Sequence, residues 1–246
     1  KAQANSAGAA EEIPLRADFS MDVDAFCASR GMRVLANPNA PTGMVLPLSE
    51  IERILSSDPD RVVLVDEAYV DFGAQTALPL LAKYENLLVV RTYSKSRSMA
   101  GARLGFALGS EALIGDLETI RFSTNPYNLN RLTLLLGEAA VADDAYYMEN
   151  CKKIAATRER TAARLKELGF TLAPSQANFL FASHPAVSGE TLYSALKLRG
   201  VLVRHFKKPR ISEYVRITIG TPEQMEVLFA AIEDILKGDT ACAPQR

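Results

Sequence analysis

The chain has 246 residues, of which 48% are hydrophobic, so it can bury the core of one large domain or of two smaller ones. Lys and Arg total 28 against 29 Asp and Glu. This balance, with a net charge of -1, excludes a broad basic surface for nucleic acid and an acidic disordered tract. No apolar run reaches about 18 residues, so the sequence predicts no membrane-spanning helix.

Cysteine and histidine are too scarce and too scattered for a metal centre. The three cysteines, Cys27, Cys151 and Cys242, lie far apart without metal-ligand spacing, and the chain has only two histidines. An odd number of dispersed cysteines is typical of a reducing compartment. We therefore expect no bound metal and a cytoplasmic location.

The first residues carry no targeting signal. The chain begins at Lys1 rather than at a methionine, and the stretch KAQANSAGAA is small and polar, without the apolar middle of a secretory signal. We expect the chain to be the back portion of a longer protein.

The first half alternates apolar runs with helical patterns. A helix is predicted at 48–57, with Ser49 and Glu52 placed as a capping box. Continuous apolar runs that helices separate favour a mostly parallel sheet sandwiched by helices, which is an α/β fold. The strands are predicted at 32–37, 61–69, 86–92 and 104–109.

The second half begins with a long helical pattern at 144–169, which ends at Gly169. The last helix, at 221–238, opens with a capping box of Thr221 and Gln224 and with proline at its first position. We place a domain boundary at residue 143. Residues 1–143 are expected to form a large domain, and 144–246 an interdomain helix and a smaller α/β domain. Its other elements are strands at 170–174, 177–182, 201–206 and 214–220, and a helix at 189–200.

Polar residues follow three of the predicted parallel strands. Asn37, Asp66 and the stretch 92–95 stand at the carboxyl ends, where ligands of such sheets bind. Asp66 is expected to form an ion pair, to cap a helix, or to partner a protonated ring nitrogen. Tyr69 is either a core residue or part of the same crevice. Asn37 begins the rigid turn NPNAPTG, where a side-chain amide can contact a ligand.

Lys95 and Arg103 flank a run of small residues in RTYSKSRSMAGARLG. A lysine after a strand is commonly a solvated surface residue, but a deprotonated lysine forms a Schiff base with a carbonyl compound. Arg103 could lower the pKa of that lysine, or could hold a phosphate, whose oxygens its guanidinium matches. Hydroxyl groups of the kind that bind phosphate are supplied by Thr92, Ser94 and Ser96.

These motifs together resemble the fold-type I aminotransferases of class I and II, which use pyridoxal 5'-phosphate, and most closely the histidinol-phosphate branch. The resemblance runs from about residue 12 to 238 and implies the fold-type I architecture with an incomplete large domain, a homodimer, and that cofactor. The matching stretches are ANPNAPTG at 36–43, VDEAYVDF at 65–72, RTYSKSRSMAGARLGFALG at 91–109, PYNLN at 126–130, ANFLF at 177–181 and VRITIGT at 215–221.

The resemblance also implies a role for each candidate residue. Lys95 would join the cofactor aldehyde and later act as general base, and Asp66 would pair with the ring nitrogen. Tyr69 and Asn37 would bind the ring oxygen. The phosphate would be held by Ser94 and Arg103, with Thr92 or Ser96 as a helper. The substrate would be bound by Asn178, Arg204 and Arg216, although Arg204 could instead form a salt bridge at a domain surface.

The implied reaction is transamination of histidinol phosphate with 2-oxoglutarate, a step of histidine biosynthesis. Three alternatives stay open: an aromatic amino-acid aminotransferase, a threonine-phosphate decarboxylase, and a non-catalytic remnant. A dinucleotide-binding module is rejected, because GARLG precedes a strand and lacks the G-x-G-x-x-G spacing. The N-terminal part of the family chain, with its phosphate-cradling helix, is expected to be missing here.

Overall fold

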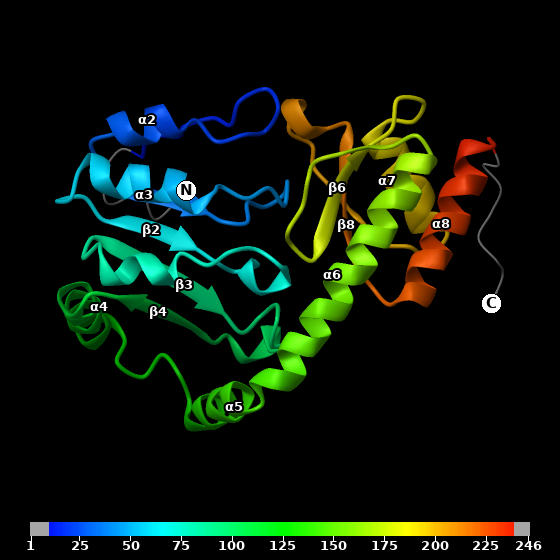
Figure 1. Ribbon diagram of the computed structural model, residues 1–246. Helices are drawn as coiled ribbons and strands as arrows, with labels where there is room; N and C mark the ends of the chain where they lie inside the picture. The colour runs from blue at the N-terminus through cyan, green and yellow to red at the C-terminus, as the bar shows by residue number, and fades with distance from the viewer. Residues whose placement is uncertain (1–9, 239–246) are drawn as a thin grey trace.

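The computed structural model describes residues 10–238, which form two sheets joined by a long helix (Figure 1). The first sheet has the strand order β1-β2-β3-β4, and the second has the order β5-β6-β8-β7. Helix α6 (Asp144–Glu167) runs diagonally from the first sheet to the second. Cys242, the third of the dispersed cysteines, lies outside the described residues. Within residues 10–238 no helix combines the length and apolar character needed to cross a bilayer.

The first sheet is mostly parallel, as predicted. Strands β1, β2 and β3 run parallel, and β4 is antiparallel to β3. One face packs on helices α2 (Val23–Ala28) and α3 (Leu48–Ser57), with Val63 and Val65 fully buried between them. The strands span Arg33–Ala36, Val63–Asp66, Leu87–Thr92 and Gly105–Gly109.

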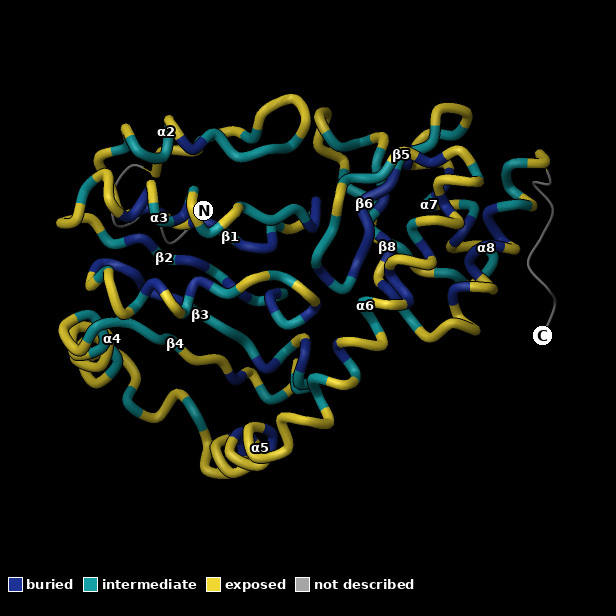
Figure 2. Tube along the Cα trace, viewed as in Figure 1, coloured by how far each residue is buried: buried dark blue, intermediate teal, exposed yellow. Residues whose placement is uncertain are grey.

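The other face of this sheet is more open. Val34 of β1 is 55% exposed, whereas Leu35 beside it is buried. Helices α4 (Glu111–Thr124) and α5 (Arg131–Ala142) follow β4, and Figure 2 shows both exposed along much of their length. The exposed surface of α5 is apolar and includes Leu132, Leu134, Leu135, Leu136 and Val141.

The second sheet is antiparallel throughout. Helices α7 (Gly189–Leu198) and α8 (Pro222–Leu236) cover one face over a core that includes Leu180 and Ile217. Strand residues alternate between the two faces. The opposite face therefore carries Phe181 and Arg216, which are register partners. The strands are β5 (Thr171–Leu172), β6 (Phe179–Ser183), β7 (Arg204–His205) and β8 (Tyr214–Thr218).

The two predicted capping boxes have opposite outcomes. The box at Thr221 and Gln224 is present in α8, with both reciprocal hydrogen bonds. The box at Ser49 and Glu52 is wrong, because α3 starts after Pro47 without any side-chain cap. The Glu52 carboxylate instead binds the Lys83 ammonium and the Tyr84 hydroxyl.

Short turns shape the strand ends. The predicted strand at 61–69 stops at Asp66, and the chain then enters the 3-10 turn η1 (Val70–Phe72). Helix α6 ends near Gly169, whose φ of +90° suits glycine, as predicted. The remaining 3-10 turns are η2 (Leu78–Ala82), η3 (Ala100–Ala102) and η4 (Pro209–Ile211).

Candidate active site

The carboxyl ends of β1, β2 and β3 lie side by side at one edge of the first sheet. The backbone N–H of Asn37 donates to the Asp66 carbonyl at 2.9 Å, and that of Glu67 donates to the Val90 carbonyl at 2.8 Å. Asp66 and Val90 are register partners in the parallel ladder. The turns that follow these strands, which carry Tyr69 and Lys95, therefore start from the same edge.

Lys95 is exposed, and its ammonium lies 5.6 Å from the centroid of the Tyr69 ring. No carboxylate in the described part of the chain forms an ion pair with it. Its neighbours are anchored, because the Ser96 hydroxyl donates to Asp71 at 2.5 Å and Arg97 donates to the Ala140 carbonyl at 3.1 Å. The turn therefore holds the lysine backbone and leaves its amine free.

Asp66 is half-buried, and its side chain accepts one hydrogen bond, from the Ala68 N–H at 3.0 Å. Residues 10–238 supply no cation within ion-pair distance of it. The next residue, Glu67, is fully buried and binds Arg91 at 2.9 Å. Of these two neighbouring carboxylates, Glu67 is neutralised inside the protein, while Asp66 retains an acceptor for a ligand.

Asn37 uses its side chain within the turn that it begins. Its amide oxygen accepts from the Leu46 N–H at 2.8 Å, and its amide nitrogen donates to the Leu46 carbonyl at 3.1 Å. The residue is only 1% exposed. One amide proton of Asn37 is left to donate to a bound molecule. Asn37 is therefore less accessible to a bound molecule than Lys95 is.

Arg103 lies in the loop that joins β3 to β4. It is exposed, and its guanidinium makes one hydrogen bond, to the Ala100 carbonyl at 3.1 Å, with no carboxylate of the described residues paired to it. Its φ of +56° is uncommon for a residue other than glycine. The Tyr93 N–H donates to the Leu104 carbonyl at 3.1 Å, which brings Arg103 beside the stretch that starts at Thr92.

The hydroxyls of that stretch are used differently. Thr92 accepts the Ser94 N–H at 3.0 Å, which shapes the turn. The Ser96 hydroxyl donates to the Asp71 carboxylate at 2.5 Å and is therefore already used within the protein. Ser94 is half-buried, which leaves its hydroxyl as the candidate phosphate ligand of the three.

Two arginines stand directly opposite each other in the second sheet. Arg204 of β7 and Arg216 of β8 are register partners, and no carboxylate among residues 10–238 neutralises either of them. The Arg216 guanidinium lies 4.9 Å from the centroid of the Phe179 ring, and its Nε is buried without a partner. Like charges opposite each other in a sheet are destabilising. This pair is therefore suited to an anionic ligand, and a salt bridge for Arg204 is absent here.

The second sheet meets the first through aromatic rings. The Tyr69 and Phe179 rings make an edge contact, with centroids 5.1 Å apart at 86°. Asn178 precedes Phe179, is half-buried, and accepts the Ile219 N–H at its carbonyl. The chain of contacts from Arg216 through Phe179 and Tyr69 to Lys95 therefore places Arg216 on the side of the second sheet that faces Lys95.

Two features of this region were not predicted. One is the buried network in which Arg91 binds Glu67 and Thr76, and lies 3.6 Å from Asp71. The other is Arg158 of α6, which reaches both halves of the molecule. Both arginines stand at sequence positions where the pattern predicts burial, and buried arginines are rare unless they are paired. This pattern could have indicated that each arginine has a partner inside the protein.

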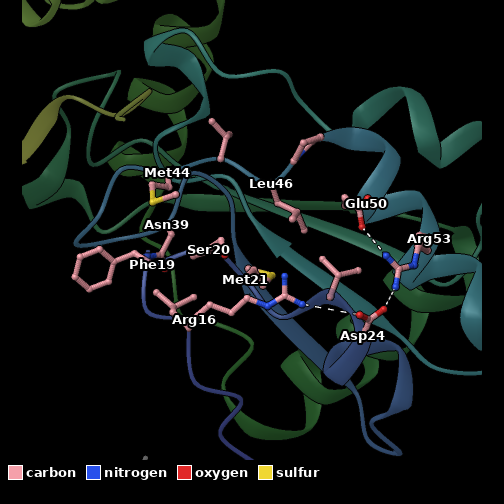
Figure 3. Close-up of a pocket in the computed structure, with 15 residues that line it drawn as sticks. Arg16, Phe19, Ser20, Met21, Asp24, Asn39, Met44, Leu46, Glu50 and Arg53 are labelled. Carbon is pink, nitrogen blue, oxygen red and sulfur yellow. Dashed lines mark hydrogen bonds and ion pairs between the residues drawn. The ribbon is translucent and has the colours of Figure 1, made fainter. Parts of the chain in front are cut away.

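A pocket near the N-terminus of the described chain is a weaker candidate (Figure 3). It lies between α2, α3 and the loop around Met44. Its charged side chains pair with one another, because Arg53 binds both Asp24 and Glu50, and Arg16 also approaches Asp24. These contacts leave little charge for a ligand, in contrast to Lys95 and Arg103.

The residues at the sheet edge fit the cofactor that the resemblance implies. A free amine at Lys95 suits its aldehyde, an acceptor at Asp66 suits a protonated ring nitrogen, and an unneutralised guanidinium at Arg103 suits its phosphate. Asp66 ends β2, and Lys95 and Arg103 follow β3. The described residues therefore supply one group suited to the aldehyde, one suited to the ring nitrogen and one suited to the phosphate.

Comparison with known proteins points in the same direction. A profile of the family described as "Aminotransferase class I and II" matches residues 2–232. The histidinol-phosphate aminotransferase of a Marinomonas species is 52% identical over 228 residues, and that of Brachyspira hyodysenteriae is 46% identical over 227 residues. These matches cover 91% and 92% of this chain, which spans 64% of the length of each relative.

A solved structure shares the fold. It is the histidinol-phosphate aminotransferase of Sinorhizobium meliloti in complex with pyridoxal-5'-phosphate, with a TM-score of 0.82 and 24% identity. The match covers 93% of this chain and 64% of that one. At this identity, the likeness establishes the shared architecture.

Proposed function

Because this chain belongs to the class I and II aminotransferase family, we propose that it binds pyridoxal 5'-phosphate and transfers the amino group of histidinol phosphate to 2-oxoglutarate. The observation that carries this proposal is the set of unneutralised groups at the edge of the first sheet. Lys95 and Arg103 have no acidic partner among the described residues, and Asp66 has no basic one. Unpaired charges at a strand-end crevice are typical of a ligand site.

Each of these residues has a defined task toward the cofactor. The Lys95 amine binds the aldehyde carbon, and the Asp66 carboxylate keeps the ring nitrogen protonated. Tyr69 and Asn37 donate to the ring oxygen. Arg103 and Ser94 hold the phosphate, and Thr92 shapes their turn. The bound cofactor supplies an electron sink for the bond that is broken at the substrate carbon.

The protein groups then move one proton. The Lys95 Nζ, when it is not bonded to the cofactor, would remove the proton from the amino-bearing carbon of the substrate. Among residues 10–238, Lys95 has no carboxylate partner to hold its charge in place. The anchored neighbours Ser96 and Arg97 keep its backbone fixed while the side chain moves.

A phosphorylated substrate is favoured by the second sheet. Arg204 and Arg216 are register partners with no acidic neighbour in the described chain, and two guanidinium groups match a phosphate dianion. The buried, unpartnered Nε of Arg216 supports an anion at this place. Asn178, which adjoins Phe179 in the chain, is assigned to bind the same substrate.

The proposal includes a homodimer and a cytoplasmic location. The exposed apolar surface of α5, which includes Leu132 and Leu136, supports the packing of a second subunit against this helix. Cys27 and Cys151 are free thiols, which supports a reducing compartment. Two separate hydrophobic clusters, one under each sheet, support the division into two domains at residue 143.

The cofactor part is tested by mapping the lysine. The chain is mixed with pyridoxal 5'-phosphate, reduced with borohydride, digested and analysed by mass spectrometry. The adduct is expected on Lys95 and is expected to disappear in Lys95→Ala. The matched control is Lys83→Ala, which removes an exposed lysine bound to Glu52 and should keep the adduct. An adduct on a different lysine would remove the basis of the proposal.

The substrate part is tested by adding histidinol phosphate, phenylalanine or threonine phosphate to the loaded protein. Conversion of the bound cofactor to its amine form by histidinol phosphate alone is the expected result. Conversion by phenylalanine would identify an aromatic aminotransferase. Release of carbon dioxide from threonine phosphate would identify a decarboxylase. Loading without any conversion would identify a non-catalytic remnant.

A further inference from the structure

Arg158 is the side chain of α6 that touches both halves of the molecule. Its Nη1 donates to the carbonyl of Phe72 at 2.8 Å and to the carbonyl of Ala177 at 2.9 Å. Its side chain is 7% exposed, and Glu159 binds the outer side of the guanidinium at 2.9 Å. One nitrogen therefore bonds two backbone segments that lie far apart in the sequence.

Both acceptors adjoin candidate site residues. Phe72 ends the 3-10 turn whose N-cap is Tyr69, the residue under the Lys95 ammonium. Ala177 is followed by Asn178 and then by Phe179, whose ring lies against the Arg216 guanidinium. The two ends of the site are thus each one short backbone segment away from Arg158.

Among residues 10–238, the Gln176 N–H of the second segment donates at 2.9 Å to the carbonyl of Gly43, which lies outside the first segment, and Tyr69 contacts Phe179 edge to face. The ring of Phe19 also packs on Phe181 and Tyr214. Rings in van der Waals contact can slide, whereas a charged hydrogen bond fixes both distance and direction. Arg158 is therefore the polar group best placed to set the spacing of the two segments.

We propose that Arg158 is a positioning residue that fixes the distance between the cofactor end of the site, at Lys95 and Tyr69, and the anion end, at Asn178 and Arg216. The functional part of this inference rests on the proposed function. A guanidinium that spanned the two segments would determine which length of substrate reaches from Lys95 to Arg216. Its loss would free the second segment to shift and would leave two buried carbonyls without a donor.

The competing explanation is that Arg158 only stabilises α6. The two explanations differ in which amides become exposed to exchange when the side chain is removed. If Arg158 bridges the segments, local opening is confined to them. If it stabilises the helix alone, α6 itself opens.

The test is hydrogen–deuterium exchange on Arg158→Met, with Arg164→Met as matched control. Arg164 lies on the same helix and pairs with Glu167 and Glu233, which are both in the second half of the chain. Arg158→Met is expected to speed exchange on the order of tenfold at residues 70–77 and 173–179. Arg164→Met should leave both segments unchanged. Faster exchange in α6 alone, or equally along the whole chain, would overturn the inference.

Arg158→Lys provides a second variant if Arg158→Met does not fold. A lysine keeps the charge and a nitrogen donor but lacks the planar guanidinium that Glu159 holds from the other side, so exchange at the two segments should lie between wild type and Arg158→Met. Wild-type exchange at both segments in Arg158→Lys would show that the planar guanidinium is not required, and would overturn the positioning role.

Binding measurements separate this inference from the proposed function. In Arg158→Lys, the KM for histidinol phosphate should rise on the order of tenfold, while affinity for pyridoxal 5'-phosphate changes less than about twofold. Equal losses of both would argue against a spacing role. If the wild-type chain takes up no cofactor, the proposed function fails, and the exchange data still decide whether Arg158 fixes the two segments.

Discussion

Lys95 and Arg216 lie against two aromatic rings that touch each other edge to face. The Lys95 ammonium is 5.6 Å from the Tyr69 centroid, and the Arg216 guanidinium is 4.9 Å from the Phe179 centroid. The rings themselves are 5.1 Å apart. Each cation–π contact is worth about 0.5–2 kcal/mol, depending on its exposure to solvent. The rings therefore orient the two cations relative to one another across the junction of the sheets.

Replacing Phe179 tests this arrangement. Phe179→Leu removes the ring under Arg216, and we expect anion affinity to fall about fivefold, which corresponds to roughly 1 kcal/mol of cation–π energy. Folding stability should also fall by about 1–2 kcal/mol, because Phe179 is buried. Calorimetric titration with histidinol phosphate measures the first effect, and urea unfolding measures the second.

The control for Phe179→Leu is Phe170→Leu. Phe170 is 5% exposed in the core of the second half and packs on His184, away from both arginines. Phe170→Leu should lower the folding stability by a similar amount without any change in anion affinity. Equal affinity losses in both variants would mean that the effect is general loosening of the second half.

Arg103 combines an unfavourable backbone with a free charge. Its φ is +56°, a conformation that costs a residue other than glycine roughly 1–2 kcal/mol. Arg103→Gly should therefore raise folding stability without ligand by about 0.5–1 kcal/mol. The same change removes the phosphate ligand, so affinity for pyridoxal 5'-phosphate should fall at least about tenfold. Thermal unfolding and cofactor titration measure the two effects.

Arg103→Lys separates charge from shape. Lysine keeps the positive charge and cannot bind two phosphate oxygens in one plane, so an intermediate cofactor affinity is expected. If Arg103→Gly bound the cofactor as tightly as wild type, the phosphate would have to be held elsewhere.

The strand positions of the first sheet could be predicted because continuous apolar runs carry their own signal. The runs at 32–37 and 86–92 became β1 and β3 with small changes at their ends. The antiparallel direction of β4 could not be predicted in the same way. Direction depends on the loop that contains Arg103, whose path follows from contacts such as the bond between Tyr93 and Leu104.

A hydrogen bond predicted from local sequence spacing is wrong where a residue distant in the chain binds the same side chain instead. Glu52 has the right spacing from Ser49 for a capping box, but it binds Lys83, which is 31 residues away in the chain. The role of Arg158 is hidden for a related reason. Its acceptors are backbone carbonyls 86 and 19 residues away, and any residue type can provide a carbonyl. The Thr221 box could be predicted because both of its partners are local.

Cys151 should resist alkylation at neutral pH. It is 2% exposed, and burial, with a further contribution from Asp71, raises the pKa of its thiol from 9.0 to about 11. A raised thiol pKa means that the reactive thiolate forms only as the pH approaches 11, so at pH 8 it is about a hundredfold rarer than for an ordinary thiol. Iodoacetamide should label the half-buried Cys27 first.

Mass spectrometry over time in a Cys242→Ser background measures the two labelling rates. Labelling of Cys151 should rise steeply between pH 8 and pH 10, while the protein stays folded by circular dichroism. Labelling of Cys151 at pH 7 at the same rate as Cys27 would contradict the raised pKa.

The two predicted capping boxes make a matched pair for stability. Thr221 accepts the Gln224 N–H at 3.4 Å, and Gln224 accepts the Thr221 N–H at 2.9 Å, at the start of the helix that covers the second sheet. Thr221→Ala should lower the free energy of unfolding by about 1 kcal/mol, since the Gln224 N–H at the helix start loses its side-chain acceptor. Ser49→Ala removes an exposed serine from a helix without a side-chain cap, so it should change stability by less than about 0.5 kcal/mol. Urea unfolding of both variants measures the difference, and equal effects would mean that the hydrogen-bonded box adds nothing to α8.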